Sequence, residues 1–311
     1  MIIKEIERVL EHKRKFKITY YEKPYLKILS IDRLNERFNG LFDNIICFNW
    51  DGSINFKILN NEIVDLFLDV LYEYENRKIN YWININRRIS EYKNKAYAFD
   101  MTKIERVLEK ISNKNILVKY MDPQFIKFWE NSNIRFGIAS SYKDVVLEQA
   151  IRDDENKMVK QINGLWMKLE KIGTDIDISG DKIHVIDGRL EIMYPYPFYV
   201  CSFAIDVDPK LFALFGYDSC VIFENYLEYI ESVQETIIRS KDVFKIHSRR
   251  VEYIDENRQL KNEANLEFQK TISYKYQNEY RFVIELNKSS DRQELVFNLN
   301  DFAAKTYKII K

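Results

Sequence analysis

The sequence predicts an α+β protein, with a small N-terminal α/β domain and a larger domain built on mostly antiparallel strands with flanking helices. First, short strand-like apolar runs outnumber helical ones, and few alternate with helices as βαβ units do. Second, tight-turn pairs such as Asp51-Gly52 and Asp187-Gly188 separate several of these runs, as they do in hairpins. Third, 311 residues, of which 46% are hydrophobic, suffice for two cores.

The first domain is expected to combine helices with a hairpin. It begins with an amphipathic helix over residues 1–15, in which Ile3, Ile6, Val9 and Leu10 lie on one side. The dense β-branched and aromatic residues of 16–21 indicate a strand. After residue 30 we expect a helix over 31–42, a hairpin over 44–59, a helix over 61–74, a strand over 78–85 and an Asp100-capped helix over 101–111. We place the domain boundary near residue 115, giving domains 1–115 and 116–311.

The second domain is expected to be richer in strands. Asp122 and Pro123 form an N-cap and first-turn pair that predicts a helix over 124–131. Another helix is expected over 225–240, and hairpin-like strands surround the turns at 179–181 and 187–189. The remaining strands are expected at 116–120, 134–140, 197–205, 220–224, 243–248, around 274–286 and at 294–299.

Composition excludes several classes of protein. The 48 basic and 48 acidic residues balance, so no net charge steers the chain to nucleic acid or an anionic membrane. The three cysteines form no C-x-x-C pair and the three histidines are isolated, so we expect no metal site. The N-terminus lacks the apolar core of a signal peptide, and the apolar run at 198–205 is too short to span a bilayer. We therefore expect a cytoplasmic protein.

Several catalytic signatures are missing from the sequence. It contains no P-loop, no G-x-G-x-x-G, no G-x-S-x-G and no H-E-x-x-H. Kinases, P-loop NTPases, Rossmann enzymes and α/β-hydrolases are therefore disfavoured.

The densest polar cluster on an expected strand is Tyr274–Arg281, directly before the apolar run FVIEL. Alternate residues of a strand share a face, so Gln277, Glu279 and Arg281 would point one way. A face of this kind is costly to bury unless its charges are paired or line a cleft. One interpretation is an exposed face with a Glu279–Arg281 pair; the other is a functional site.

The string Y-Q-N-E-Y-R, residues 276–281, resembles the Y-[EQ]-x-E-[YW]-R signature of a bacterial family of unknown function that prophages and defence loci often carry. Further landmarks of that family are matched in order along residues 116–286. They are Val118-Lys119-Tyr120, Ile134–Gly137 with Tyr142, Arg152–Glu155, Cys201-Ser202-Phe203 and Cys220–Glu224, although Ser219 stands where the family usually has Gly. The resemblance implies an effector of a prophage or phage-defence system, such as an abortive-infection toxin.

The order Arg135, Ser202, then Gln277 with Glu279, resembles the Arg–Ser–[QE]xE layout of ADP-ribosyltransferases. This resemblance implies NAD as cofactor, a catalytic Glu279 that stabilises an oxocarbenium-like state, and Gln277 helping to choose the acceptor. Arg135 and Ser202 would hold NAD, and either Lys119, followed by Tyr120, or Arg152 could take the place of Arg135. The resemblance would imply a Ser-Thr-Ser triplet at this serine, and Ser202 does not lie in one.

Other functions remain open at this point. The chain could be a non-enzymatic interaction protein in which Glu279 and Arg281 form a structural pair. It could also be a metal-dependent nuclease that uses the acidic residues of 152–155, which otherwise form a solvated loop. The basic and aromatic residues of 78–88 could bind nucleic acid, and 247–250 could bind phosphate, although ordinary strand ends are favoured for both. The expected partners are a macromolecular acceptor and a phage or host trigger protein, with no membrane.

Overall fold

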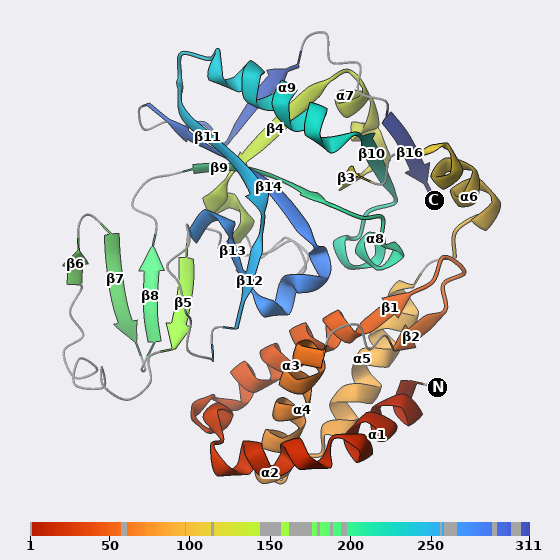
Figure 1. The fold of residues 1–311 in the computed structure, drawn as a ribbon, viewed down its shortest axis with the longest axis vertical. Coiled ribbons are helices and arrows are strands. Elements are labelled where there is room, and N and C mark those ends of the chain that lie inside the picture. Colours follow the sequence, from red (N-terminus) through yellow and green to blue (C-terminus); the bar gives the residue numbers. More distant parts are fainter. Residues whose placement is uncertain are drawn as a thin grey trace. The chain divides into compact units, whose positions relative to one another are not determined.

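The computed structural model describes residues 2–56, 61–96, 98–112, 115–143, 157–161, 176–178, 181–186, 189–193, 198–255, 257, 266–287, 291–299 and 306–311. The chain forms two compact units (Figure 1). The first unit comprises residues 1–99 and 271–276, and the second unit comprises residues 100–270 and 277–311. The α+β class expected from the sequence is confirmed.

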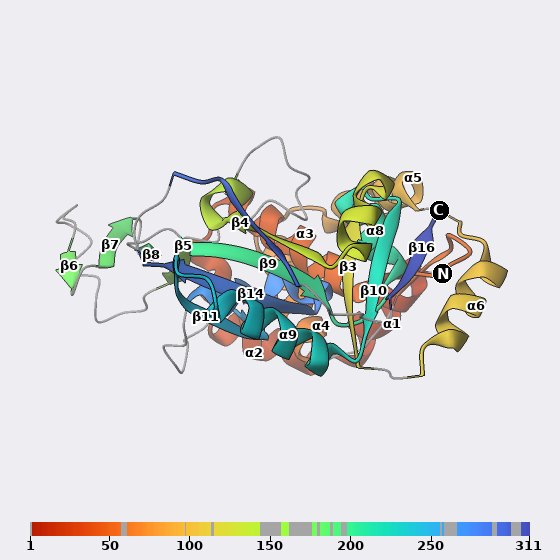
Figure 2. The ribbon, with the colours of Figure 1, turned by 90° about the horizontal axis from the view of Figure 1, so that it is seen from above.

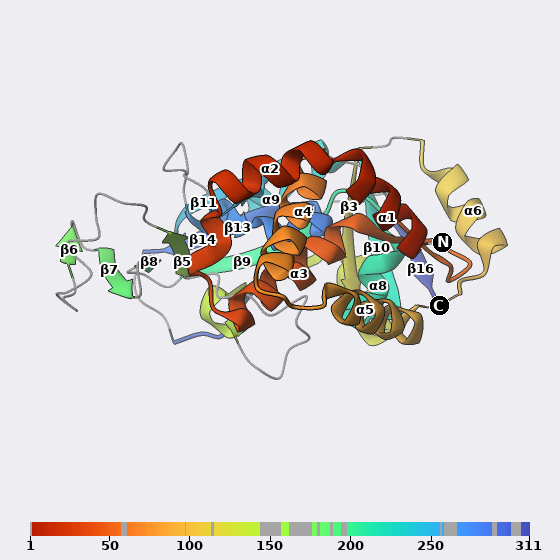
Figure 3. The ribbon, with the colours of Figure 1, turned by 90° about the horizontal axis from the view of Figure 1, so that it is seen from below.

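The first unit is mainly helical. Helices α2, α4 and α3 lie side by side (Figure 3). Between α3 and α4 the stacked rings of Phe38 and Phe42 pack against the tilted ring of Phe67. The expected hairpin at Asp51-Gly52 is present, with Gly52 in the left-handed region at φ 78°. The elements are α1 Ile2–His12, α2 Arg14–Glu22, η1 Tyr25–Ile28, α3 Ile31–Ile45, β1 Ile46–Phe48, β2 Ile54–Phe56, α4 Asn61–Asn76 and α5 Tyr81–Lys95.

Two expected strands of this unit are helices, so those predictions were wrong. Residues 16–21 belong to α2, where Tyr20 is buried and packs against Tyr72 of α4. Residues 81–85 begin α5, which Asn80 caps by accepting a hydrogen bond from the Trp82 backbone N–H at 3.1 Å. Helix propensities differ by only a few tenths of a kcal/mol among most residues, so burial against a neighbouring helix decides the conformation.

The second unit is centred on an eight-stranded antiparallel sheet. Its main path runs β11-β14-β9-β3-β10-β16, while β4 pairs with both β9 and β15. Figure 2 shows β9 between β14 and β3. The strands are β3 Ile116–Met121, β4 Asn133–Ile138, β9 Phe198–Ala204, β10 Ser219–Glu224, β11 Val243–Arg250, β14 Glu279–Leu286, β15 Glu294–Asn298 and β16 Thr306–Ile310.

Helices and shorter strands complete the unit. The expected hairpin strands form a second antiparallel sheet, β5-β8-β7-β6, whose turn residues 179–180 and 187–188 lie outside the described residues. Pro123 begins a 3-10 turn as expected, but the Asp122 side chain accepts no capping hydrogen bond. The other elements are α6 Met101–Lys110, η2 Pro123–Phe125, α7 Ile126–Glu130, η3 Ala139–Lys143, β5 Lys157–Gln161, β6 Ile176–Ile178, β7 Asp181–Ile186, β8 Arg189–Met193, α8 Pro209–Phe215, α9 Tyr226–Ile238, β12 Glu252–Ile254, η4 Leu266–Phe268, β13 Gln269–Thr271 and η5 Ile272–Gln277.

The two faces of the large sheet carry different residues. One face forms the main apolar core with α7 and α9, in which Trp129 and Tyr229 pack against Phe203. Figure 1 shows α9 crossing β11 on this side. On the opposite face, Val200 and Val283 belong to a small cluster with Phe268. Ser202, Glu279 and Arg281 lie on this second face.

Helix α6 belongs to the second unit, so the units divide at residues 99 and 100 rather than near 115. Its expected cap is present, because the Asp100 side chain accepts a hydrogen bond from the Lys103 N–H at 3.3 Å. The end of the helix is tied to the sheet through buried Glu224, which accepts hydrogen bonds from the Ser112 N–H at 2.7 Å and the Tyr307 hydroxyl at 3.0 Å. Within the described ranges, no helix combines the length and apolar character needed to cross a bilayer.

Candidate functional site

The polar cluster lies where β14 begins beside β9. Glu279 is the first residue of β14 and pairs in register with Ala204, while Arg281 pairs with Ser202. Lys270 comes from β13, and Gln277 ends η5. We call Lys270, Gln277, Glu279 and Arg281 the Glu279 cluster.

Glu279 is paired through both carboxylate oxygens. Arg281 donates from Nε and Nη2 to Oε1, each at 3.2 Å, and Lys270 Nζ lies 3.0 Å from Oε2 at ion-pair distance. Lys270 also donates to Gln277 Oε1 at 3.0 Å, and Arg281 Nη1 donates to the Glu267 carbonyl at 2.5 Å. Glu279 and Arg281 therefore share a face of β14, as expected from the sequence. The expected strand does not extend back to residues 274–277, which form the 3-10 turn η5, and Gln277 reaches the cluster through its bond with Lys270.

The cluster is buried rather than exposed. Arg281 is 0% exposed, Gln277 4%, Glu279 6% and Lys270 7%. The Glu279–Arg281 pair forms, but the expectation that it lies on an exposed strand face was wrong. The sheet buries this face because Phe268 and the Lys270 strand lie against it.

The cluster keeps Glu279 ionised. Burial by itself would raise the pKa of this carboxyl, but the charges of Arg281 and Lys270 and a hydrogen bond with the Ser202 side chain hold it well below its usual range. Two cations thus surround one carboxylate, and removal of that carboxylate would leave them buried without a counter-charge.

Arg135 lies on the same face of the sheet as Ser202. Gly137 of β4 pairs with Val200 of β9, and alternate residues of a strand share a face. The Arg135 side chain is 55% exposed and pairs with Glu294 of β15, with Nε 2.6 Å from Oε2. The structure therefore brings Ser202 into contact with Glu279 and places Arg135 at the exposed part of the same face.

Lys119 and Tyr120 lie on opposite faces of β3. Lys119 Nζ donates to the Ser202 backbone carbonyl at 2.8 Å and lies over the rings of Trp129 and Phe203. The Tyr120 hydroxyl accepts a hydrogen bond from the Asp208 N–H at 2.8 Å, which fixes the start of α8. Both side chains are thus engaged in holding the sheet, and their expected role toward NAD stays a prediction.

The other candidates are placed only in part. Residues 152–155, the expected acidic loop, lie outside the described residues. The part of the chain that is described contains no group of three or more His, Cys, Asp or Glu residues suited to a metal. Arg88 of the 78–88 segment pairs with Asp43, and Arg249 lies 4.5 Å from the ring centre of Phe268.

A hollow of about 270 Å³ lies elsewhere in the second unit. It is lined by Ser240 and Asp242 beyond α9, by Leu286 at the end of β14, and by β15 and the residues before it, including Arg292 and Val296. Val296, which lines this hollow, is 50% exposed, and Ile238 and Phe244, which are 69% and 67% exposed, lie close in sequence to the lining residues Ser240 and Val243. Exposed apolar side chains next to a hollow are found at protein-binding surfaces.

Three residues were not selected from the sequence. Lys270 completes the Glu279 cluster, and Gly40 and Asn44 of α3 contact Ile272 and Ser273, which lie between Lys270 and Gln277. The chain is rich in Lys and Asn, so single residues of these types carried little weight. Gly40 did offer a signal, because it lies inside a helical pattern in a chain with only 8 glycines.

No family model, curated protein or solved structure matches this chain. Its function is therefore argued from its own residues.

Proposed function

We propose that this chain acts by binding a macromolecular partner, and that the Glu279 cluster stabilises the second unit. The mutual burial of Glu279 and Arg281 carries this proposal. A carboxylate that acts on the ribose of NAD must contact that sugar, but both Glu279 oxygens face cations of the protein itself. A buried, fully paired carboxylate is the arrangement expected of a structural ion pair.

The surface around the hollow at the end of α9 supports binding. Ile238, Phe244 and Val296 expose apolar side chains, and the hollow is lined by Arg292 and Asp242, which pair at 3.4 Å. Apolar anchors with a charged rim suit a protein partner, because the anchors supply most of the affinity and the charges supply specificity.

Two variants separate binding from catalysis. Phe244→Asp should weaken partner binding by tenfold or more, on the order of a lost hot-spot residue, whereas Ser202→Ala, beside Glu279, should leave it unchanged. The partner would be sought by affinity capture with the wild-type chain, and the dissociation constants of both variants would then be measured. Equal binding by wild-type chain and Phe244→Asp would contradict this surface.

ADP-ribosyl transfer is the second candidate function, because Ser202 contacts an ionised Glu279 on the face that carries Arg135. In this function Arg135 and Ser202 would hold NAD and Gln277 would face the acceptor. The described conformation does not fit NAD at Glu279, because the cations occupy the space around the carboxylate. Catalysis would therefore require the cluster to open.

Incubation with labelled NAD and bacterial lysate decides between the two functions. The binding proposal expects no transfer of label by the wild-type chain. Transfer that is lost in both Arg135→Ala and Ser202→Ala, with melting temperatures near the wild-type value, would replace it with the catalytic function. Arg135 is an informative position because its exposed pair with Glu294 contributes little to folding.

A further inference from the structure

The segment Thr271–Tyr276, here called the latch segment, belongs to the first unit although the residues on both sides belong to the second. Lys270 precedes it and Gln277 follows it, and these two side chains are hydrogen-bonded at 3.0 Å. Two members of the Glu279 cluster therefore join the two ends of the latch segment. Whatever holds the latch segment also constrains those two residues through the chain.

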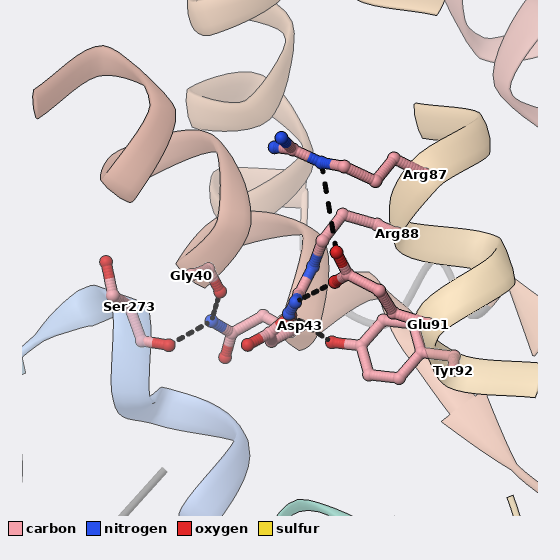
Figure 4. Close-up of polar contacts among 8 residues, drawn as sticks. Gly40, Asp43, Arg87, Arg88, Glu91, Tyr92 and Ser273 are labelled. Carbon is pink, nitrogen blue, oxygen red and sulfur yellow. Dashed lines mark hydrogen bonds and ion pairs between the residues drawn. The ribbon is translucent and has the colours of Figure 1, made fainter. Parts of the chain in front are cut away.

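Asn44 of α3 binds the backbone of the latch segment. Its side-chain Nδ2 lies 3.2 Å from the Ile272 carbonyl and 3.0 Å from the Ser273 carbonyl, and 2.7 Å from the Gly40 carbonyl of its own helix. Figure 4 shows Ser273 facing Gly40 across this contact. Ile272 is buried, at 3% exposure. Asn44 thus adds a side-chain donor to carbonyl groups at the start of the 3-10 turn η5 and ties the turn to α3.

Gly40 makes the close approach possible. A Cβ atom at this position would lie 2.3 Å from Ser273 Cβ and 2.5 Å from its Oγ. Apart from proline, glycine is the least favourable residue inside a helix, so its presence in the middle of α3 needs a reason. The reason is the packing of the latch segment against the helix.

The backbone between the latch segment and β14 is held in an unusual conformation. Asn278 has φ 45°, in the left-handed region, and it separates Gln277 from Glu279. Such a residue persists where the chain is fixed on both sides. Here α3 fixes one side and the sheet fixes the other. If the latch segment were released, Asn278 could relax, and Gln277 would move away from Lys270.

We propose that the first unit regulates the second through the latch segment. While α3 holds Thr271–Tyr276, Gln277 and Lys270 stay bonded and Glu279 stays buried. A ligand that displaces the segment from Gly40 and Asn44 opens the cluster and exposes the carboxylate. This regulation goes beyond the proposed binding function and does not depend on which partner the second unit takes.

Hydrogen–deuterium exchange of the full chain tests the proposal. Asn44→Ala removes the donor, and Gly40→Ala pushes Ser273 away. Both variants should raise amide exchange at residues 277–281 by about tenfold, because each lowers the free energy of local opening. The α4 amides should keep their wild-type rates. Glu36→Ala, on the exposed side of the same helix, is the matched control and should change neither region.

A second substitution distinguishes release of the latch from general damage to α3. Ser273→Gly removes the two closest atoms, Cβ and Oγ, and leaves Cα at 3.0 Å. Gly40→Ala with Ser273→Gly should therefore restore most of the slow exchange at residues 277–281. Unchanged exchange there in folded Asn44→Ala and Gly40→Ala would overturn the proposal. If Gly40→Ala alone exposes α4, recovery of α4 protection in the double variant without recovery at 277–281 would overturn it as well.

Discussion

Arg281 and Glu279 form an ion pair on a buried face of the sheet. Because the pair is buried, replacing either residue should lower the stability of the fold. Glu279→Gln keeps the size of the side chain but leaves Arg281 and Lys270 without a carboxylate. We expect the free energy of unfolding to fall by about 3–5 kcal/mol, as when one partner of a buried pair is removed. Urea denaturation measures it.

Glu294→Gln is the control for this substitution. It breaks the pair with Arg135, whose side chains are 47% and 55% exposed, and should change the unfolding free energy by less than about 1 kcal/mol. A Glu279→Gln protein as stable as Glu294→Gln would show that the buried pair contributes little to folding.

The same carboxylate predicts a pH dependence. Its pKa is lowered in the folded chain, so its stabilising contribution is complete above the pKa of the unfolded chain, about 4.3. The contribution is lost as the pH falls through the lowered, folded-state pKa. The stability difference between wild-type and Glu279→Gln should therefore be constant from pH 7 to about pH 5.5 and should shrink below about pH 4. A difference that grows on acidification would contradict this sign.

Sequence reasoning found part of this site. Alternation along the strand correctly placed Glu279 and Arg281 on one face, because that needs only a local rule. It was wrong for Gln277, which lies in the 3-10 turn before the strand. It did not find Lys270, since the pairing depends on β13 lying against this face. The exposure of the face was also mispredicted, because burial depends on elements distant in sequence.

At the scale of elements, α3 and α5 are joined by a polar contact among otherwise apolar residues. Arg88 donates to Asp43 at 2.5 Å and to the Tyr92 hydroxyl at 3.0 Å, and Tyr92 donates to Asp43 (Figure 4). Asp43→Asn should lower the free energy of unfolding by about 2–4 kcal/mol, because Arg88 and the Tyr92 hydroxyl are largely buried. Thermal or urea unfolding monitored at 222 nm measures the change.

The exposed pair Arg33–Glu36 lies on α3 as well and supplies the control. Glu36→Gln should leave the unfolding free energy within about 0.5 kcal/mol of the wild-type value. Equal effects of Asp43→Asn and Glu36→Gln would mean that the α3–α5 contact is held by its apolar residues alone.

Helices and strands were predictable where the pattern was long or the cap was clear. The helices at 31–45 and 61–76 and most strands of the large sheet follow from periodicity, and Asp100 marks α6. The edge strand β16 was not predicted. Residues 16–21 and 78–85 were mispredicted as strands, because a short aromatic and β-branched window fits the period of a helix as well as that of a strand. In α5 the buried pair Ile85 and Tyr92 is two helical turns apart, a spacing that becomes visible only over a longer window.

For the whole molecule, proteolysis in the stretch between α5 and β3 should have an unusual result. Limited trypsin digestion is expected to cut between about residues 95 and 118, where the chain passes from the first unit to the second. The two fragments should still elute together on gel filtration, because the latch segment remains bound to α3. They should separate after Asn44→Ala weakens that contact.

Separate elution of the wild-type fragments would contradict this expectation and would also indicate that α3 binds the latch segment weakly. A Glu36→Ala chain, cut in the same way, should behave as the wild type does. The comparison therefore attributes any separation to the loss of the Asn44 contacts.

The discontinuity of the first unit also limits how such a chain can exchange parts with a relative. A recombination event at a single point near residue 100 would transfer α3 without the six residues, 271–276, that pack on it. A recipient whose own segment carried a larger side chain at position 273, or whose helix lacked glycine at position 40, would receive two surfaces that collide. The first unit is thus transferred intact only when the coding regions for residues 1–99 and 271–276 are transferred in the same event.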